Sequence, residues 1–153
     1  MRRALVLLLL LAAACGSSPD PNPSTSVAAT LAIGTASGVR SFDVEVADTA
    51  AERAKGLMDR ESLSPYDGMA FVWAEPVESS FWMKDTLIPL SIAFWDEDGK
   101  IVSVMDMEPC EADPCPTYGP DAPYVGAVEV GQGEFERRGV GVGDTVDLST
   151  QSA

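Results

Sequence analysis

The strongest constraint on the fold of this sequence is a series of short apolar segments separated by turn residues. Phe42, Val44 and Val46 alternate with Asp43 and Glu45, which is typical of a strand with one buried face. Asp96–Gly99 is a turn between two such segments and predicts a hairpin. The further predicted strands cover residues 69–73, 87–95, 100–107, 124–130 and 140–148.

Helical patterns are few. Thr49 and Glu52 have the spacing of a capping box, and Gly56 is placed to end a helix over about 50–56. A short polar segment near 134–138 separates the last two predicted strands. The sequence therefore predicts a mainly β (α+β) fold: one compact antiparallel sandwich or partly closed barrel over 31–149, with one or two short helices.

The N-terminus has the pattern of an export and anchoring segment. Arg2 and Arg3 precede an apolar run, Ala4–Ala14, which is too short to span a bilayer and ends in small residues before Cys15. Residues 1–14 are thus a predicted lipoprotein signal peptide, although Ala12 stands where a bacterial lipobox usually has Leu. We expect a lipid on Cys15 that anchors the protein outside the cytoplasm, to the cell membrane or the outer membrane.

The alternative is an ordinary secreted protein that is cleaved nearby, with Cys15 incidental. In either case residues 15–30, rich in Ser and Pro, are expected to be an extended tether. The predicted mature chain lacks Arg2 and Arg3, which leaves 8 basic and 24 acidic residues and a formal charge of −16.

Composition excludes several functions. The full chain has a formal charge of −14, so it lacks the clustered Lys and Arg that nucleic-acid binding needs. It contains no His, which removes the Ser-His-Asp and Cys-His catalytic arrangements and the commonest transition-metal ligand. We expect no cofactor.

Two groups of sulfur-containing residues have alternative interpretations. Cys110 and Cys115 lie close together among prolines, which predicts a disulfide outside the cytosol; a metal-binding or redox pair is the alternative. Five methionines of the mature chain could hold Cu(I) through their thioethers, although Met is also a common core residue. They are Met58, Met69, Met83, Met105 and Met107.

Several motifs together carry a family resemblance. Arg53–Arg60, Gly68–Val72 and Phe81–Thr86 are followed in order by Asp98–Val102, the two cysteines with their prolines, Tyr118, Glu129-Val130 and Gly143-Asp144. Over about Val44–Leu148 the sequence resembles the prokaryotic family called domain of unknown function 192. The resemblance implies a compact, mainly β domain that is often secreted or lipid-anchored, and it brings no established activity.

The family motifs supply the candidate ligand-binding residues, which are Arg53, Arg60, Trp82, Lys84, Thr86 and Glu129. We expect Arg53, Lys84 and Glu129 to converge near Trp82 in a small polar pocket with an aromatic wall. The alternative is that the basic residues form ion pairs that stabilise the fold. Two positions depart from the family pattern: Asp85 replaces the usual Asn, and Ser91 replaces the usual Asp.

These observations favour a non-enzymatic module, monomeric by default, that binds a small ligand or another envelope protein. The first alternative is an envelope hydrolase that acts on glycans with carboxylates. The second is a copper-handling protein that uses Met. We expect no catalytic residues.

Overall fold

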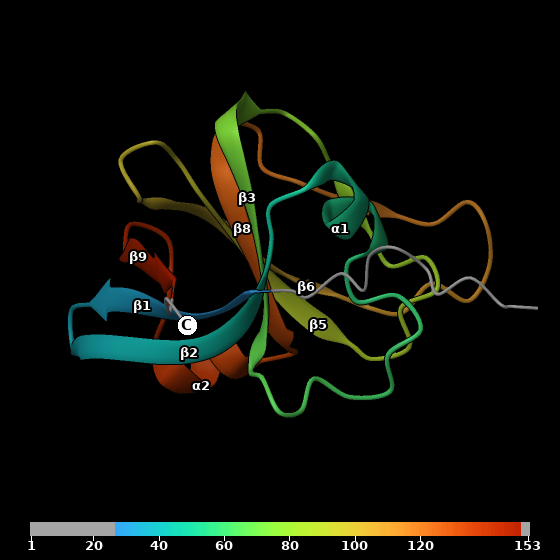
Figure 1. The fold of residues 1–153 in the computed structure, drawn as a ribbon, viewed down its shortest axis with the longest axis horizontal. Helices are drawn as coiled ribbons and strands as arrows, with labels where there is room; N and C mark the ends of the chain where they lie inside the picture. Colours follow the sequence, from blue (N-terminus) through green and yellow to red (C-terminus); the bar gives the residue numbers. More distant parts are fainter. Residues whose placement is uncertain (1–26, 151–153) are drawn as a thin grey trace, which may run out of the picture.

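Residues 27–150 are described by a computed structural model, in which they form a seven-stranded mixed sheet, a two-stranded ribbon and two short helices (Figure 1). The strands are β1 (Val27–Thr35), β2 (Gly38–Ala47), β3 (Gly68–Val77), β4 (Phe81–Trp82), β5 (Leu90–Trp95), β6 (Ile101–Met107), β7 (Thr117–Tyr118), β8 (Tyr124–Gly131) and β9 (Thr145–Thr150), and the helices are α1 (Ala50–Lys55) and α2 (Glu134–Arg138). The predicted mainly β class is confirmed. The predicted signal peptide and the predicted lipidation site, Cys15, lie outside the described residues.

The large sheet has the strand order β6-β5-β8-β3-β2-β1-β9. Its neighbouring strands are antiparallel, as expected, except that β2 and β3 are parallel. A parallel pair needs a long crossover, and the segment between Ala47 and Gly68, which contains α1, provides it. The sheet does not close into a barrel, although Lys100 and Thr145 form an isolated bridge between its two edges.

Side chains alternate between the two faces of the sheet and form two buried clusters. On β8, Val128 and Val130 belong to one cluster, which also contains Phe135 of α2. Ala127 belongs to the other cluster, together with Leu57, which follows α1. We call these sides of the sheet the α2 face and the α1 face; the two helices lie far apart in Figure 1.

The ends of four elements differ from the sequence prediction. β1 begins at Val27 and so includes the last residues of the expected tether. β5 begins at Leu90 instead of at residue 87, because Pro89 has no N–H to donate to a neighbouring strand. Residues 140–144 form a turn, in which Gly143 has a φ of 90°, and β9 starts only at Thr145. β3 is longer than predicted, reaching Val77.

The capping box predicted for α1 is confirmed. The Thr49 hydroxyl accepts a hydrogen bond from the Glu52 N–H, and the Glu52 carboxylate accepts one from the Thr49 N–H. The carboxylate of Glu52 also accepts a hydrogen bond from the Thr49 hydroxyl, and this bond above all, together with the one from the Thr49 N–H, holds the pKa of Glu52 below its usual value. Within residues 27–150, no helix is long and apolar enough to cross a membrane.

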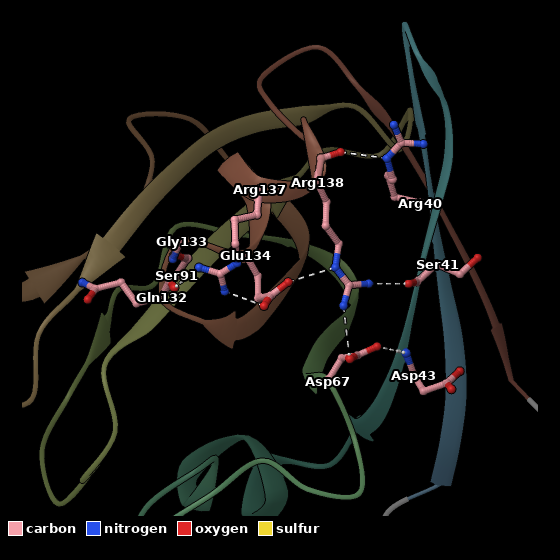
Figure 2. A network of polar contacts seen from close by, with 10 residues as sticks. All are labelled: Arg40, Ser41, Asp43, Asp67, Ser91, Gln132, Gly133, Glu134, Arg137 and Arg138. Carbon is pink, nitrogen blue, oxygen red and sulfur yellow. Dashed lines mark hydrogen bonds and ion pairs between the residues drawn. The ribbon is translucent and has the colours of Figure 1, made fainter.

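Polar contacts fix α2 on its face of the sheet (Figure 2). The Ser91 hydroxyl donates to Asp106 on β6 and accepts from the Gly133 N–H at the start of the helix, at 2.9 Å. Arg138 pairs with Glu134 and Asp67, and its guanidinium group lies over the Phe42 ring, 4.3 Å from the centroid. The polar groups at this helix are therefore well satisfied.

Cys110 and Cys115 form a disulfide, as predicted, with a Cα–Cα distance of 5.6 Å. The loop that it closes lies beside β4, since the Cys110 N–H donates to the Met83 carbonyl. Asp113 of this loop pairs with Lys84 at 3.1 Å. The disulfide loop thus supports the segment that follows β4.

Candidate functional site

A cleft of about 480 Å³ opens on the α1 face of the sheet. One wall is α1 with the residues that follow it, and the other is formed by β3, β4 and the loop between them. The lining residues that the following paragraphs use are Arg53, Phe71, Trp73, Phe81, Trp82, Thr86 and Glu129.

The aromatic wall of the cleft is a packed cluster. The Phe81 ring contacts the Phe71 ring edge-to-face, with centroids 5.0 Å apart, and lies 6.2 Å from the Trp73 ring. Trp73 also contacts Tyr124, whose hydroxyl donates to the Ser79 carbonyl at 2.9 Å. Because these contacts connect β3, β4 and β8, the wall is formed before any ligand arrives.

Glu129 is the buried acid of the cleft. It lies on the central strand β8, directly opposite Met69 on β3 and Ile92 on β5. Its exposed fraction is 4%, and no hydrogen bond or ion pair from residues 27–150 reaches its carboxyl group. In that range, every side-chain oxygen or nitrogen that is completely inaccessible has a hydrogen-bond partner. Because the Glu129 carboxyl group has no partner, its oxygens are not completely inaccessible, and they are open to the cleft that Glu129 lines.

Burial raises the pKa of Glu129 to about 8. The carboxyl group is therefore mostly protonated at pH 7 and can both donate and accept a hydrogen bond. A buried carboxyl group without a partner is costly for the fold, and such groups are concentrated at functional sites.

Arg53 lies on α1 at the edge of the cleft. Its Nη1 donates to the Val72 carbonyl at 2.9 Å and to the Asp48 carbonyl, and its guanidinium group lies 5.1 Å from the Trp73 ring centroid. It forms no ion pair with any acid among residues 27–150, so its charge is fixed in position and not neutralised.

The structure brings four of the six candidate residues to the cleft: Arg53, Trp82, Thr86 and Glu129. Lys84 does not line it, contrary to the expectation that Lys84 converges with Arg53 and Glu129. Its ammonium group instead pairs with Asp113 and lies 5.7 Å from the Trp82 ring centroid. The alternating pattern of a strand suggested convergence, but β4 ends at Trp82 and the chain turns after it.

Arg60 is also absent from the cleft. It pairs with Glu45 and lines a separate hollow of about 130 Å³. The geometry of Arg60 and Lys84 thus agrees with the alternative hypothesis, in which the basic residues form ion pairs. Three methionines, Met69, Met83 and Met107, are buried in the apolar cluster of the α1 face, as core packing predicts.

The two departures from the family pattern have structural roles. Asp85 is exposed and has a φ of 54°, a left-handed conformation that Asn and Asp adopt more readily than most residues. Ser91 is on the α2 face, opposite the cleft, where it connects Asp106 to the start of α2. Neither position lines the cleft.

Sequence reasoning missed most of the aromatic wall, including Phe71, Trp73 and Phe81. Phe71 and Trp73 have the two-residue spacing that places side chains on the same face of a strand. Because that spacing equally predicts a packed core, only the open cleft beside these residues distinguishes the two roles.

The fold and the cleft define this protein as a small, mainly β domain with an aromatic-lined cleft on one face of a mixed sheet. Two solved structures are similar. One is a Sinorhizobium meliloti 1021 protein described as a candidate transcription regulator, with a TM-score of 0.73 and 28% identity, covering 83% of this chain and 98% of that one. The other is a protein of unknown function from Novosphingobium aromaticivorans DSM 12444, with a TM-score of 0.74 and 30% identity, covering 90% and 98%.

The family model of domain of unknown function 192 (DUF192, an uncharacterized ACR) matches residues 32–148. The chain belongs to this family, as the sequence motifs indicated. No curated protein matches the chain significantly.

Proposed function

We propose that this protein is a lipid-anchored component of the bacterial cell envelope that binds a small organic ligand in the cleft and does not transform it. The observation that carries the proposal is Glu129, a buried carboxyl group without a partner that is open to a preformed cleft. A structural acid in that position would be expected to have a partner, as Glu134 has on the other face.

Binding agrees better with the lining of the cleft than hydrolysis does. Glycoside hydrolysis usually requires two carboxyl groups, about 5 to 9.5 Å apart. Among the described residues that line the cleft, Glu129 is the only acid. A role in transcription, which the description of the Sinorhizobium protein suggests for that protein, is not favoured here because a chain with a charge of −14 would be repelled by nucleic acid.

Anchoring outside the cytoplasm is supported by the basic start, the apolar run and Cys15. The Cys110–Cys115 disulfide is in keeping with an oxidising compartment. Replacement of Cys15 with Ser should abolish lipid labelling and release the protein from membranes. If C15S still fractionated with membranes and still carried the lipid label, the proposed anchoring would be contradicted.

The cleft can be tested with a pair of substitutions on α1. Ala54 is exposed and lines the cleft, whereas Ala51 is exposed on the same helix and lines the smaller hollow. The purified full-length protein is titrated with a collection of small organic compounds, with tryptophan fluorescence as the readout because Trp73 and Trp82 line the cleft. Hits should be lost in A54W and kept in A51W. An absence of hits, or equal loss in both variants, would refute ligand binding at this cleft.

A further inference from the structure

Three features of the cleft define the chemistry of a ligand more narrowly, if the proposed binding function holds. The first is the unused half of the Arg53 guanidinium group. Its two hydrogen bonds both come from Nη1, which leaves the Nε and Nη2 N–H groups without a partner in residues 27–150. Those two groups form the planar fork that pairs with both oxygens of a carboxylate.

The second feature is local charge. Arg53 and Lys55 are the basic side chains that line the cleft, and Glu129 is the acid. Lys55 pairs with Asp59, which is not a lining residue. With Glu129 protonated, the cleft is locally positive on a chain whose formal charge is −14, and a local positive site on an acidic protein is where an anionic group is stabilised.

The third feature is the distance between the two polar ends. Glu129 is opposite Met69 on β3, and Arg53 is bonded to the carbonyl of Val72, three residues further along the same strand. At about 3.3 Å per residue, the backbone positions of β3 beside the two groups are roughly 10 Å apart along the strand. Phe71 lies on the cleft between them, with Phe81 against it.

We propose that the ligand is an elongated organic acid, with a carboxylate at Arg53, an apolar or aromatic body against Phe71 and Phe81, and a neutral hydrogen-bonding group at Glu129. An amine in place of the carboxylate would face Arg53 with like charge. The Trp73 ring already carries the Arg53 guanidinium group, so it is less available to a ligand cation.

A matched set of probes tests this assignment by calorimetry on the full-length protein at pH 7. The set is para-hydroxyphenylpropionate, its amide, tyramine, and phenylpropionate, which lacks the hydroxyl group. We expect the hydroxylated acid to bind at least about tenfold more tightly than the amide or tyramine, and several-fold more tightly than phenylpropionate. In R53Q the advantage of the acid over the amide should disappear.

Ionisation of Glu129 provides a second test that does not require a change at Arg53. The residues opposite Glu129 on the neighbouring strands are Met69 and Ile92, which do not titrate. The other titratable side chains that line the cleft are Arg53 and Lys55 of α1. Affinity for the acid should fall as the pH rises above about 8 in the wild type, and it should stay level in E129Q. Parallel pH profiles in the two proteins would remove Glu129 from the assignment.

The outcomes separate the ligand class from the cleft itself. If tyramine or the amide binds as well as the acid, or if compounds of other classes bind and none of the four probes does, the organic-acid assignment is wrong. If A54W then fails to bind the compounds that do bind the wild type, the proposal that ligands bind in this cleft would still be supported. If neither the probes nor the wider collection binds, both proposals fail.

Discussion

Two glutamates five residues apart in the sequence have opposite electrostatic environments. Glu129 is buried on the α1 face without a partner, and burial raises its pKa to about 8. Glu134 is on the α2 face, where hydrogen bonds from Arg137 above all, and from Arg138, lower its pKa (Figure 2). The two groups therefore affect stability in opposite directions as pH changes.

The contrast distinguishes a structural polar residue from a candidate functional one. On the α2 face, Ser91 and Arg138 have partners that attach the helix to the sheet, and Glu134 pairs with Arg138 within the helix. On the α1 face, Glu129 and Arg53 are positioned by the fold, yet neither is paired with an opposite charge among residues 27–150. The polar side chains described on the α2 face thus have partners within the fold, whereas Glu129 and Arg53 on the α1 face keep hydrogen-bonding groups that a ligand can use.

The largest expected effect is that of Glu129→Gln. Because the folded pKa of about 8 lies above the ordinary value of 4.5, the wild type loses stability as pH rises between these values, by up to about 5 kcal/mol. The Gln side chain of E129Q does not titrate. E129Q should therefore be more stable than the wild type at pH 9 and have a similar stability near pH 4. Urea unfolding across this range measures the difference.

Glu45→Gln is the matched control, because Glu45 is a buried glutamate that is paired with Arg60. E45Q should show no such gain at high pH. An E129Q curve that stays parallel to the wild type at every pH would mean that Glu129 is not an unpartnered buried acid.

The next largest effect should come from Ser91→Ala on the α2 face. Loss of the hydroxyl group leaves the Gly133 N–H and Asp106 without their shared partner, which should cost about 1–3 kcal/mol of unfolding free energy. Ser103→Ala on β6 removes a hydroxyl group that has no such contacts within residues 27–150, and it should change stability by less than about 0.5 kcal/mol. Equal effects in denaturant unfolding would contradict the role of Ser91.

A smaller effect is expected from Glu134→Gln. Because the folded pKa of Glu134 is depressed, its contribution is present above the ordinary carboxyl pKa and is lost as pH falls through the folded value. E134Q should therefore be less stable than the wild type by about 1 kcal/mol at pH 7, with the difference shrinking below about pH 4. Glu136→Gln, on the exposed side of the same helix, is the control; a similar loss in both variants would remove the special position of Glu134.

The smallest effect should be that of Lys84→Met. Lys84 and Asp113 form an exposed ion pair, which typically contributes less than about 1 kcal/mol. Since Lys84 does not line the cleft, K84M should bind para-hydroxyphenylpropionate within about twofold of the wild type, in contrast to R53Q. Calorimetry compares them, and a tenfold loss in K84M would place Lys84 in the site after all.

The sequence by itself determined the local features of this protein. Alternation of apolar and polar residues around Phe42–Val46 indicated a strand, Thr49 and Glu52 indicated the start of α1, and the cysteine spacing indicated the disulfide. These features depend on residues close together in the chain, so a pattern of a few positions is enough to predict them. The family motifs also indicated Arg53, Trp82, Thr86 and Glu129, all of which line the cleft.

Only the tertiary structure decided which charged groups have partners. Arg53 is fixed by a carbonyl 19 residues away and Arg60 by a glutamate 15 residues away, whereas nothing in residues 27–150 pairs with Glu129. Lys84 and Arg53 look equivalent as basic residues in family motifs, yet one pairs with Asp113 outside the cleft and the other lines it. Pairing depends on which strands become neighbours and on how far the chain turns between them, and a local sequence pattern does not contain that information.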